Sequence, residues 1–304
     1  MIIPSYLKKG DTIAITCTAG FMPKKNSTAC VKALKKQGYT VIVSPTVGGR
    51  SKTYFSGTDE ERLVGFQKYL DDKNVKAILC GRGGYGTGRI IDKIDFIKFV
   101  KNPKWIIGFS DITILLNHIA SNFNIATIHG PMTTGFDNKT QNPENVISLL
   151  NTLKGEHSTI EITPHLLNRI GNVKGKLVGG NLCLFANAIG TPSDTNTKNC
   201  ILFIEEIGEV YYAIDRMMHQ LKRAGKLSNL AALVVGNFTD ATDTNRPFGK
   251  TIYQIISEIV AEYNYPVCFD FPVGHGVENR ALMVGGKYNL SIGKEKVMLS
   301  QSPL

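Results

Sequence analysis

Short apolar runs rich in β-branched residues alternate with segments of helical periodicity through the first half of the chain. Predicted strands lie at residues 12–17, 40–44, 75–80, 105–107 and 125–128. Predicted helices lie at residues 27–37, 59–70 and 89–96, with a further helix beginning at Asp111. Strands that alternate with helices pair in parallel, because each helix returns the chain to the same end of the sheet. We therefore predict that residues 1–155 form an α/β domain with a doubly wound parallel sheet.

The second half of the chain has a different pattern. Residues 156–172 are mostly polar, contain Pro164 and Gly171 and follow no clear period, so we predict a linker there. Beyond the linker, two helices with one apolar face each are predicted around Ile214 and Ile255. Strands are predicted at residues 174–178, 201–204, 231–235 and 268–271, with short antiparallel strands within 281–300. We predict that residues 173–304 form a smaller α/β domain with a mixed sheet.

Composition narrows the classes of partner. The chain has 304 residues, enough for two medium domains, and 42% of them are hydrophobic, which excludes a disordered chain. Its 35 Lys and Arg residues against 25 Asp and Glu residues give a net charge of +10, which favours acidic partners. Because the cations are scattered, with no run of five, the charge does not predict binding to nucleic acid. Acidic partners also include carboxylate-rich small substrates.

The cysteines and the longest uncharged stretch bear on where in the cell the protein is found. The six cysteines lie far apart with no C-x-x-C pair, so neither a zinc site nor a redox pair is predicted, and free thiols favour a reducing compartment. The first residues have no signal-peptide pattern. The longest stretch without charged residues, 112–136, is too polar to cross a bilayer. We predict a cytoplasmic protein that does not enter the membrane.

A glycine-rich segment follows the predicted strand at 75–80. Gly81, Gly83 and Gly86 match the G-x-G-x-x-G pattern of dinucleotide sites, in which backbone N–H groups approach an anion. The pattern follows the third predicted strand rather than the first, and no acidic residue ends a strand about 20 residues later. A dinucleotide site, a structural turn and an oxyanion-binding loop remain open, and we favour the last.

Ser110 lies where a predicted strand runs into a predicted helix, within Gly108-Phe109-Ser110-Asp111. A nucleophilic serine on a sharp strand-to-helix turn has this arrangement, since the turn exposes its Oγ atom. The match to the G-x-S-x-G pattern is partial, because Ile112 stands where the last glycine belongs. Ser110 or Asp111 as a helix N-cap is the structural alternative.

A catalytic serine needs a base and an acid. Most single histidines are structural, but His275 lies between two glycines just after the predicted strand at 268–271, where a loop leaves room for substrate. Glu205 and Glu206 directly follow the apolar strand at 201–204. A carboxylate delivered by a buried strand needs a partner, which a histidine would supply. The alternative is a pair of surface carboxylates that cap a turn.

Taken in order, these segments resemble the LD-carboxypeptidase family, serine peptidases that cut L,D-peptide bonds, whose relatives include microcin C self-immunity peptidases. The matching segments lie at residues 81–86, 108–111, 129–132, 179–182, 203–209, 215–216 and 274–276. Each is modest alone, but together in this order they are specific, and they extend over most of the chain.

The resemblance implies a Ser–His–Glu triad without a metal or cofactor. The family's nucleophile, base and acid correspond to Ser110, His275 and Glu205, and Glu206 and Glu209 compete with Glu205 for the third role. The nucleophile then lies in the first domain and the base and acid in the second. The family also often forms homodimers.

The same resemblance suggests which groups would bind the substrate. The backbone N–H of Asp111 and one from Gly83 or Gly84 would stabilise the oxyanion. Arg82 would either attract the substrate's terminal carboxylate or pair with a nearby acid.

The implied substrate is an anionic muropeptide tetrapeptide that loses its terminal D-alanine in peptidoglycan recycling. A hydrolase of peptide-nucleotide toxins is the alternative within the family. Such an enzyme would need an aromatic wall for a base, and the only tryptophan, Trp105, is predicted to lie within a strand. A non-catalytic binder of dinucleotides or sugar phosphates is the alternative from another class.

Overall fold

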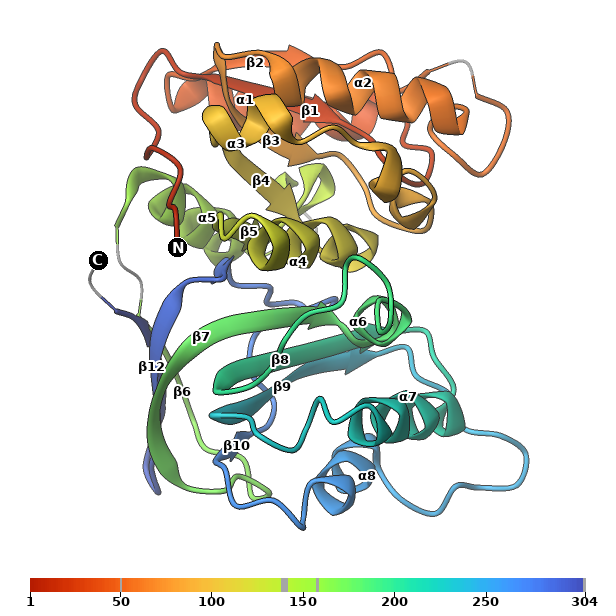
Figure 1. Cartoon of the computed structure of the whole chain (residues 1–304), viewed down its shortest axis with the longest axis vertical. Coiled ribbons are helices and arrows are strands. Elements are labelled where there is room, and N and C mark those ends of the chain that lie inside the picture. The colour runs from red at the N-terminus through yellow and green to blue at the C-terminus, as the bar shows by residue number, and fades with distance from the viewer. Residues whose placement is uncertain (50, 138–141, 157–158, 303–304) are drawn as a thin grey trace. The chain divides into compact units, whose positions relative to one another are not determined.

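The computed structural model describes residues 1–49, 51–137, 142–156 and 159–302 (Figure 1). The chain divides into two compact units. Unit 1 comprises Met1–Glu156 and Arg280–Val284, and unit 2 comprises His157–Asn279 and Gly285–Leu304. Among the described residues, no helix has both the length and the apolar character needed to cross a bilayer.

Unit 1 is built on a six-stranded sheet in the order β11-β5-β4-β3-β1-β2. Its strands are β1 (Thr12–Thr16), β2 (Thr40–Val43), β3 (Val75–Cys80), β4 (Trp105–Gly108), β5 (Thr127–His129) and β11 (Leu282–Val284). Strands β1 to β5 are parallel and β11 is antiparallel to β5. The chain runs outward from β1 to β2 and then crosses back to β3, so the loops after β1 and β3 meet at the reversal point, where α/β sheets bind ligands.

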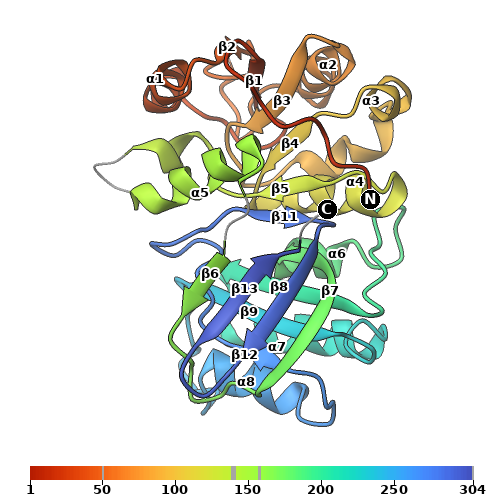
Figure 2. The same cartoon turned by 90° about the vertical axis from the view of Figure 1, so that its left-hand side faces the viewer.

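Helices cover both faces of this sheet, as expected for a doubly wound fold. One face carries α1 (Thr28–Lys36) and α5 (Pro143–Lys154), and the other carries α2 (Asp59–Asp71), α3 (Ile97–Lys101) and α4 (Thr113–Asn122) (Figure 2). The central strands are buried on both sides, which explains their nearly continuous apolar sequences.

Unit 2 is built on a seven-stranded sheet in the order β10-β9-β8-β7-β12-β13-β6. Its strands are β6 (Thr159–Ile162), β7 (Gly171–Asn181), β8 (Cys200–Ile207), β9 (Ala232–Thr239), β10 (Val267–Cys268), β12 (Lys287–Ile292) and β13 (Val297–Gln301). Strands β7 to β10 are parallel, and β12, β13 and β6 add antiparallel pairs.

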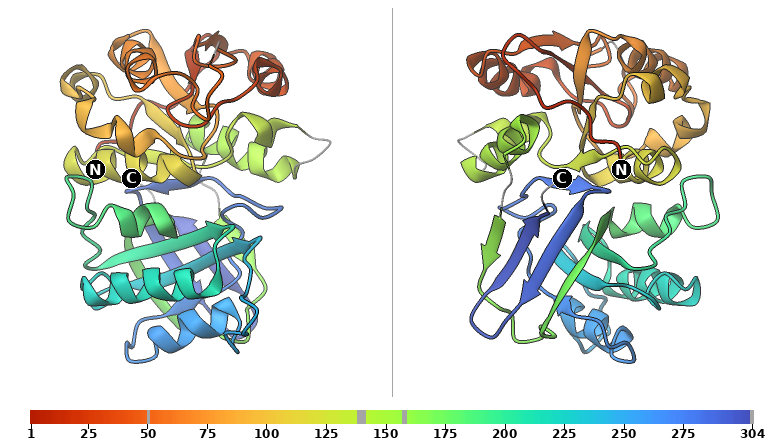
Figure 3. Two further views of the ribbon diagram at one scale, coloured as in Figure 1. Left: turned by 90° about the vertical axis from the view of Figure 1, so that its right-hand side faces the viewer. Right: turned by 60° about the vertical axis from the view of Figure 1, so that its left-hand side comes forward.

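Three helices complete unit 2: α6 (Leu182–Asn187), α7 (Tyr211–Arg223) and α8 (Ile252–Ile259). The apolar faces of α7 and α8 pack on the parallel strands in one core. Figure 3 shows these two helices beside the sheet of unit 2. The predicted fold class, a parallel sheet domain followed by a domain with a mixed sheet, is confirmed.

Three local expectations were wrong. Within the predicted linker, Thr159–Ile162 forms the edge strand β6, whose alternation of exposed and half-buried residues is too short to recognise. The strand β11 was expected in the second domain but pairs with β5 in unit 1, because the buried run Leu282–Val284 finds its partner about 150 residues earlier. The helix expected at 89–96 is replaced by two short 3₁₀ turns, Thr87–Arg89 and Ile91–Lys93.

Candidate active site

Ser110 has a backbone conformation that is rare for its residue type. Strand β4 ends at Gly108, and Ser110 opens a 3₁₀ turn before α4 with φ of +62°, in the left-handed region. Such a conformation costs about 1–3 kcal/mol for a residue other than glycine and persists where the surroundings enforce it, often at functional sites. The N-cap of α4 is Ile112, so neither Ser110 nor Asp111 has the capping role that was the structural alternative.

The glycine loop after β3 lies directly against Ser110. A Cβ atom on Gly83 would stand 2.9 Å from Ser110 Cβ, 3.0 Å from its Oγ and 3.3 Å from the backbone nitrogen of Asp111. The loop is held there by the N–H of Gly20, which donates to the Gly83 carbonyl oxygen at 3.0 Å. Gly83 therefore leaves open the space beside the hydroxyl and the Asp111 N–H, as an oxyanion site requires.

Replacing Gly83 with alanine is expected to lower kcat by about 10²–10³-fold, because the new Cβ atom would fill the space beside the Ser110 hydroxyl and keep the oxyanion away from its N–H donors. The backbone of Gly83 does not have a positive φ, so alanine fits the loop conformation and the damage is confined to the space beside Ser110. Steady-state kinetics together with a thermal melt would check this. A variant that melts like the wild type and keeps its full kcat would contradict the assignment of the loop.

The two other groups predicted in this loop have different surroundings. Gly84 has φ of +95°, and a Cβ atom there would stand 2.8 Å from the Tyr54 hydroxyl oxygen. Arg82 is exposed, and its Nη1 donates to the carbonyl oxygen of Phe21 at 2.8 Å. Among the described residues, no carboxylate forms an ion pair with Arg82. Of the two roles predicted for Arg82, the structure therefore does not show pairing with a nearby acid.

His275 and Glu205 form a pair within unit 2. Strand β8 delivers Glu205 into a fully buried position, and its Oε2 lies 2.7 Å from Nδ1 of His275. Gly274 has φ of +116°, and a Cβ atom there would stand 2.7 Å from Glu205 Cβ, so only glycine allows the loop to approach. Because a buried carboxylate needs a partner, the burial of Glu205 contradicts its interpretation as part of a surface pair.

Glu206 points into a different environment. Its Oε1 accepts hydrogen bonds from Asn181 Nδ2 at 2.7 Å and from the Ile207 N–H at 2.9 Å, and its Oε2 accepts one from the Cys183 N–H at 2.7 Å. These bonds fasten the start of α6 to β8. Glu209 is half-buried beyond the end of β8. Of the three competing carboxylates, Glu205 is the one that the structure pairs with His275.

Burial raises the pKa of Glu206 from 4.5 to about 7, and the hydrogen bonds that it accepts oppose this rise. Between those two values the folded chain binds more protons at this carboxyl group than the unfolded chain does. The free energy of unfolding should therefore fall as the pH rises through this window. Glu206→Gln does not ionise, so it should gain about 1–3 kcal/mol relative to the wild type between pH 5 and pH 8. Urea unfolding of both proteins at pH 5 and at pH 8 checks this prediction. If the free energies of unfolding of the variant and the wild type differ by the same amount at both pH values, the prediction is wrong.

One residue that supports the histidine loop escaped the sequence analysis. The side chain of Asn279 is buried, and its Oδ1 accepts a hydrogen bond from the Gly274 N–H at 3.1 Å. No local pattern identifies it, because an asparagine five residues after a glycine is common in any loop. Its contact fixes the entry to the segment that carries His275.

Two other chemically capable side chains belong to the core. His118 is buried and stacks on Phe96 with ring centroids 5.3 Å apart, and burial lowers its pKa. Cys80, the next candidate nucleophile by its position beside the glycine loop, is completely buried, and burial raises the pKa of its thiol. Both environments are those of structural residues.

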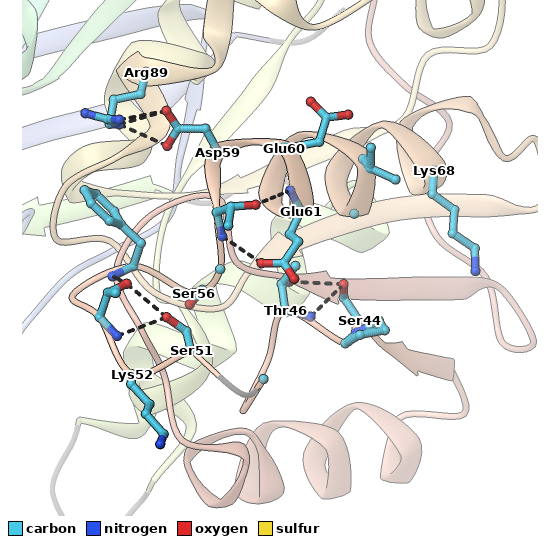
Figure 4. A pocket seen from close by; sticks show the side chains of 18 of the residues that line it. Ser44, Thr46, Ser51, Lys52, Ser56, Asp59, Glu60, Glu61, Lys68 and Arg89 are labelled. Carbon is cyan, nitrogen blue, oxygen red and sulfur yellow. Dashed lines mark hydrogen bonds and ion pairs between the residues drawn. The ribbon is translucent and has the colours of Figure 1, made fainter.

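A pocket of about 1230 Å³ lies elsewhere in unit 1, between the segment after β2 and the first turns of α2 (Figure 4). Hydroxyl groups of Ser44, Thr46 and Ser56 line it together with the Asp59–Arg89 ion pair. Its lining includes neither Ser110 nor Gly83. The pocket is therefore separate from the candidate catalytic residues.

Comparisons with known proteins show similarity over nearly the whole chain. The probable murein peptide carboxypeptidase of Bacillus subtilis (strain 168) is 34% identical over 302 residues, which cover 97% of this chain and 93% of that protein. The crystal structure of muramoyltetrapeptide carboxypeptidase from Oxalobacter formigenes superposes with a TM-score of 0.88 at 28% identity, covering 96% of this chain and 99% of that one. A mutant of the microcin C7 self immunity protein, in complex with adenosine monophosphate, shares the fold with a TM-score of 0.88 at 21% identity, covering 100% of this chain and 99% of that one.

Two family models match the chain, and together they span most of it. The model of the LD-carboxypeptidase N-terminal domain matches residues 13–130, which include the glycine loop and Ser110. The model of the C-terminal domain matches residues 174–290, which include Glu205 and His275. The resemblance inferred from the sequence is confirmed, and the chain belongs to the LD-carboxypeptidase family.

Proposed function

We propose that this protein is a serine LD-carboxypeptidase that releases the terminal D-alanine from murein tetrapeptides. Ser110 is the nucleophile, His275 the general base and Glu205 the acid that orients the base. The observation that carries this proposal is the strained Ser110 turn, with φ of +62°, packed against Gly83. The His275–Glu205 pair at 2.7 Å and the similarity to murein peptide carboxypeptidases support it.

In the first half of the reaction, His275 donates its Nδ1 hydrogen to Glu205, so its Nε2 atom accepts the proton of the Ser110 hydroxyl. The Ser110 oxygen attacks the carbonyl carbon of the L,D-peptide bond. Collapse of the tetrahedral intermediate breaks the C–N bond, and His275 returns the proton to the amine of the leaving D-alanine. The remaining tripeptide is then held as an ester of Ser110.

In the second half, His275 takes a proton from water, and the resulting hydroxide attacks the ester carbonyl. The proton returns to the Ser110 oxygen as the ester bond breaks and the tripeptide leaves as a carboxylate. In both halves the oxyanion accepts hydrogen bonds from the backbone N–H of Asp111 and one from Gly83 or Gly84. Every group needed for this acyl transfer is supplied by the chain, so the proposal includes no metal or cofactor.

The proposal extends to the setting of the enzyme. Six free thiols favour a reducing compartment, so we place the protein in the cytoplasm, where it would act in peptidoglycan recycling. The net charge of +10 favours an anionic muropeptide over a neutral substrate. We expect no nucleic-acid partner, and a homodimer by analogy with the family.

A hydrolase of peptide-nucleotides is the second candidate, and one observation favours it. Tyr85 follows Gly84 in the glycine loop, and the hydroxyl group of Tyr54 lies close to Gly84. Tyr54 is 59% exposed and Tyr85 is 52% exposed, so both offer aromatic faces to a ligand. The tryptophan that was considered for this role, Trp105, is fully buried, and its Nε1 donates to the Ser5 carbonyl oxygen. The first candidate rests on relatives closer in sequence.

A direct comparison of substrates separates the two candidates. The purified protein is incubated with a murein tetrapeptide, the corresponding tripeptide and an aspartyl sulfamoyl adenosine, and products are followed by mass spectrometry. We expect free alanine from the tetrapeptide, no product from the tripeptide, and cleavage of the nucleotide conjugate at least about tenfold more slowly. Preferential cleavage of the conjugate would replace the first candidate with the second, and inertness towards all three would contradict both.

A further inference from the structure

Arg62 is an unusual residue for the interior of unit 1. It lies in the first turns of α2, a helix that begins with three acidic residues, yet its side chain is completely buried. A buried cation costs several kcal/mol unless its hydrogen bonds and its charge are met. The role that we infer for Arg62 rests on the proposed function and concerns how the glycine loop is held next to Ser110.

The guanidinium group joins the two loops that meet at the reversal point of the sheet. Its Nη1 donates to the carbonyl oxygen of Thr18, which lies just after β1. The same Nη1 donates at 2.9 Å to the carbonyl oxygen of Gly86, in the glycine loop after β3. Its Nη2 forms an ion pair with Asp59. A planar guanidinium with fixed donors can bind several acceptors at set angles, which an ammonium group cannot do.

A second set of contacts links the same loop to the nucleophile turn. The Thr87 N–H donates to Oδ2 of Asp111 at 2.8 Å, and the hydroxyl groups of Thr87 and Thr18 lie 2.9 Å apart. Thr18, Thr87 and Asp111 are all buried. The end of the glycine loop is thus bonded to Arg62 on one side and to the residue after Ser110 on the other.

We propose that Arg62 is a positioning residue that fixes the glycine loop next to Ser110. At this distance a backbone N–H of the loop can donate a hydrogen bond to the oxyanion. Arg62 contacts neither substrate nor reacting atoms; it acts through Gly86 and the loop residues before it. Catalytic donors must be held within about 0.5 Å of their productive position, so a small displacement of this loop weakens a bond made in the transition state.

The chain offers a matched control in Arg89. Its guanidinium forms an ion pair with the same Asp59 at 2.8 Å, seen in Figure 4. It also lies over the same Phe55 ring as Arg62: the guanidinium carbon is 5.3 Å from the ring centroid for Arg89 and 4.9 Å for Arg62. The Arg89 side chain is 45% exposed and bonds to Asp59 and Tyr85, not to the carbonyl groups of Thr18 and Gly86. The backbone N–H of Arg89, which alanine keeps, donates to the Gly86 carbonyl oxygen at 3.2 Å. Arg89→Ala therefore removes a cation from Asp59 and from the ring without removing the bonds that join the loops.

The test measures kcat and KM for tetrapeptide hydrolysis by Arg62→Lys and Arg89→Ala. Arg62→Lys keeps the charge and loses the fork of donors, so kcat should fall about 10–100-fold while KM stays within about threefold. Arg89→Ala should keep kcat within about twofold. A kcat for Arg62→Lys within twofold of the wild type, or equal losses in the two variants, would overturn the proposal.

Thr87→Val provides a second variant in case Arg62→Lys does not fold. It removes the hydroxyl contacts of Thr87 with Thr18 and with Asp111 but keeps the Thr87 backbone N–H, and kcat should fall about 3–10-fold at unchanged KM. If Arg62→Lys fails to fold, an unchanged kcat for Thr87→Val would overturn the proposal.

Amide hydrogen exchange separates this proposal from the proposed function. Exchange in residues 83–87 should speed up at least about tenfold in Arg62→Lys, or in Thr87→Val if the former does not fold, and should stay at the wild-type rate in Arg89→Ala. If the wild type releases no alanine, the proposed function fails while the exchange data still decide whether Arg62 holds the loop. Unchanged exchange in an active enzyme would refute the role of Arg62 alone.

Discussion

Ser110→Ala is expected to lower kcat for tetrapeptide hydrolysis by about 10⁴–10⁶-fold, since loss of the nucleophile of a triad removes covalent catalysis altogether. The backbone at Ser110 has φ of +62°, which alanine adopts at a similar energetic cost, so the fold should be preserved. Substrate binding should also be nearly unchanged. Kinetics at high enzyme concentration and isothermal titration with the tetrapeptide measure the two effects separately.

Cys80→Ala is the matched control for this experiment. Cys80 directly precedes the glycine loop and carries a nucleophilic thiol, but it is buried in the core of unit 1. This variant should keep kcat within about twofold and lose some thermal stability because a small cavity forms. Residual activity above a few percent in Ser110→Ala, together with inactivation in Cys80→Ala, would move the nucleophile to the thiol.

Glu205→Gln is expected to have the second largest effect, a loss of about 10³–10⁴-fold in kcat. The buried carboxylate accepts the Nδ1 hydrogen of His275 at 2.7 Å, and an amide at this position can present its NH₂ group instead and favour the wrong tautomer of the imidazole. KM should change little, because the effect is on the protonation of the base. Steady-state kinetics across the pH range checks the size of the loss.

Glu209→Gln is the control for this substitution, since Glu209 lies four residues further along the same segment. Glu209 is half-buried, whereas Glu205 is fully buried. We expect kcat of Glu209→Gln to stay within about fivefold of the wild type. A large loss in this variant with little change in Glu205→Gln would transfer the orienting role to Glu209.

The candidate catalytic residues could be predicted because each has a local signature. Ser110 lies two residues beyond the apolar strand β4, Glu205 lies near the carboxyl end of the apolar strand β8, and His275 is flanked by glycines in a loop after an apolar run. In an α/β sheet these positions are the ends of strands, where functional groups gather. The alternation of strands and helices likewise predicted the fold class, because it depends on short-range periodicity.

What could not be predicted depends on long-range contacts. Arg62 occurs in Asp59-Glu60-Glu61-Arg62, which has the composition of a solvated helix start, and only the folded sheet reveals that this arginine points inward to Thr18 and Gly86. Strand β11 is similar, since its three residues cannot indicate that their partner β5 lies far back in the chain. Pairings of this kind are properties of the fold and not of the segment.

The central claim is that Ser110 and the His275–Glu205 pair act as one catalytic unit, and the double variant Ser110→Ala/Glu205→Gln tests it most directly. Residues that act as a unit have non-additive effects, because an orienting acid has nothing to orient once the nucleophile is gone. Over long incubations with tetrapeptide, we expect kcat of the double variant to match that of Ser110→Ala within about threefold. A kcat lower by the full factor that Glu205→Gln causes alone would contradict the account, because the two sites would then contribute independently.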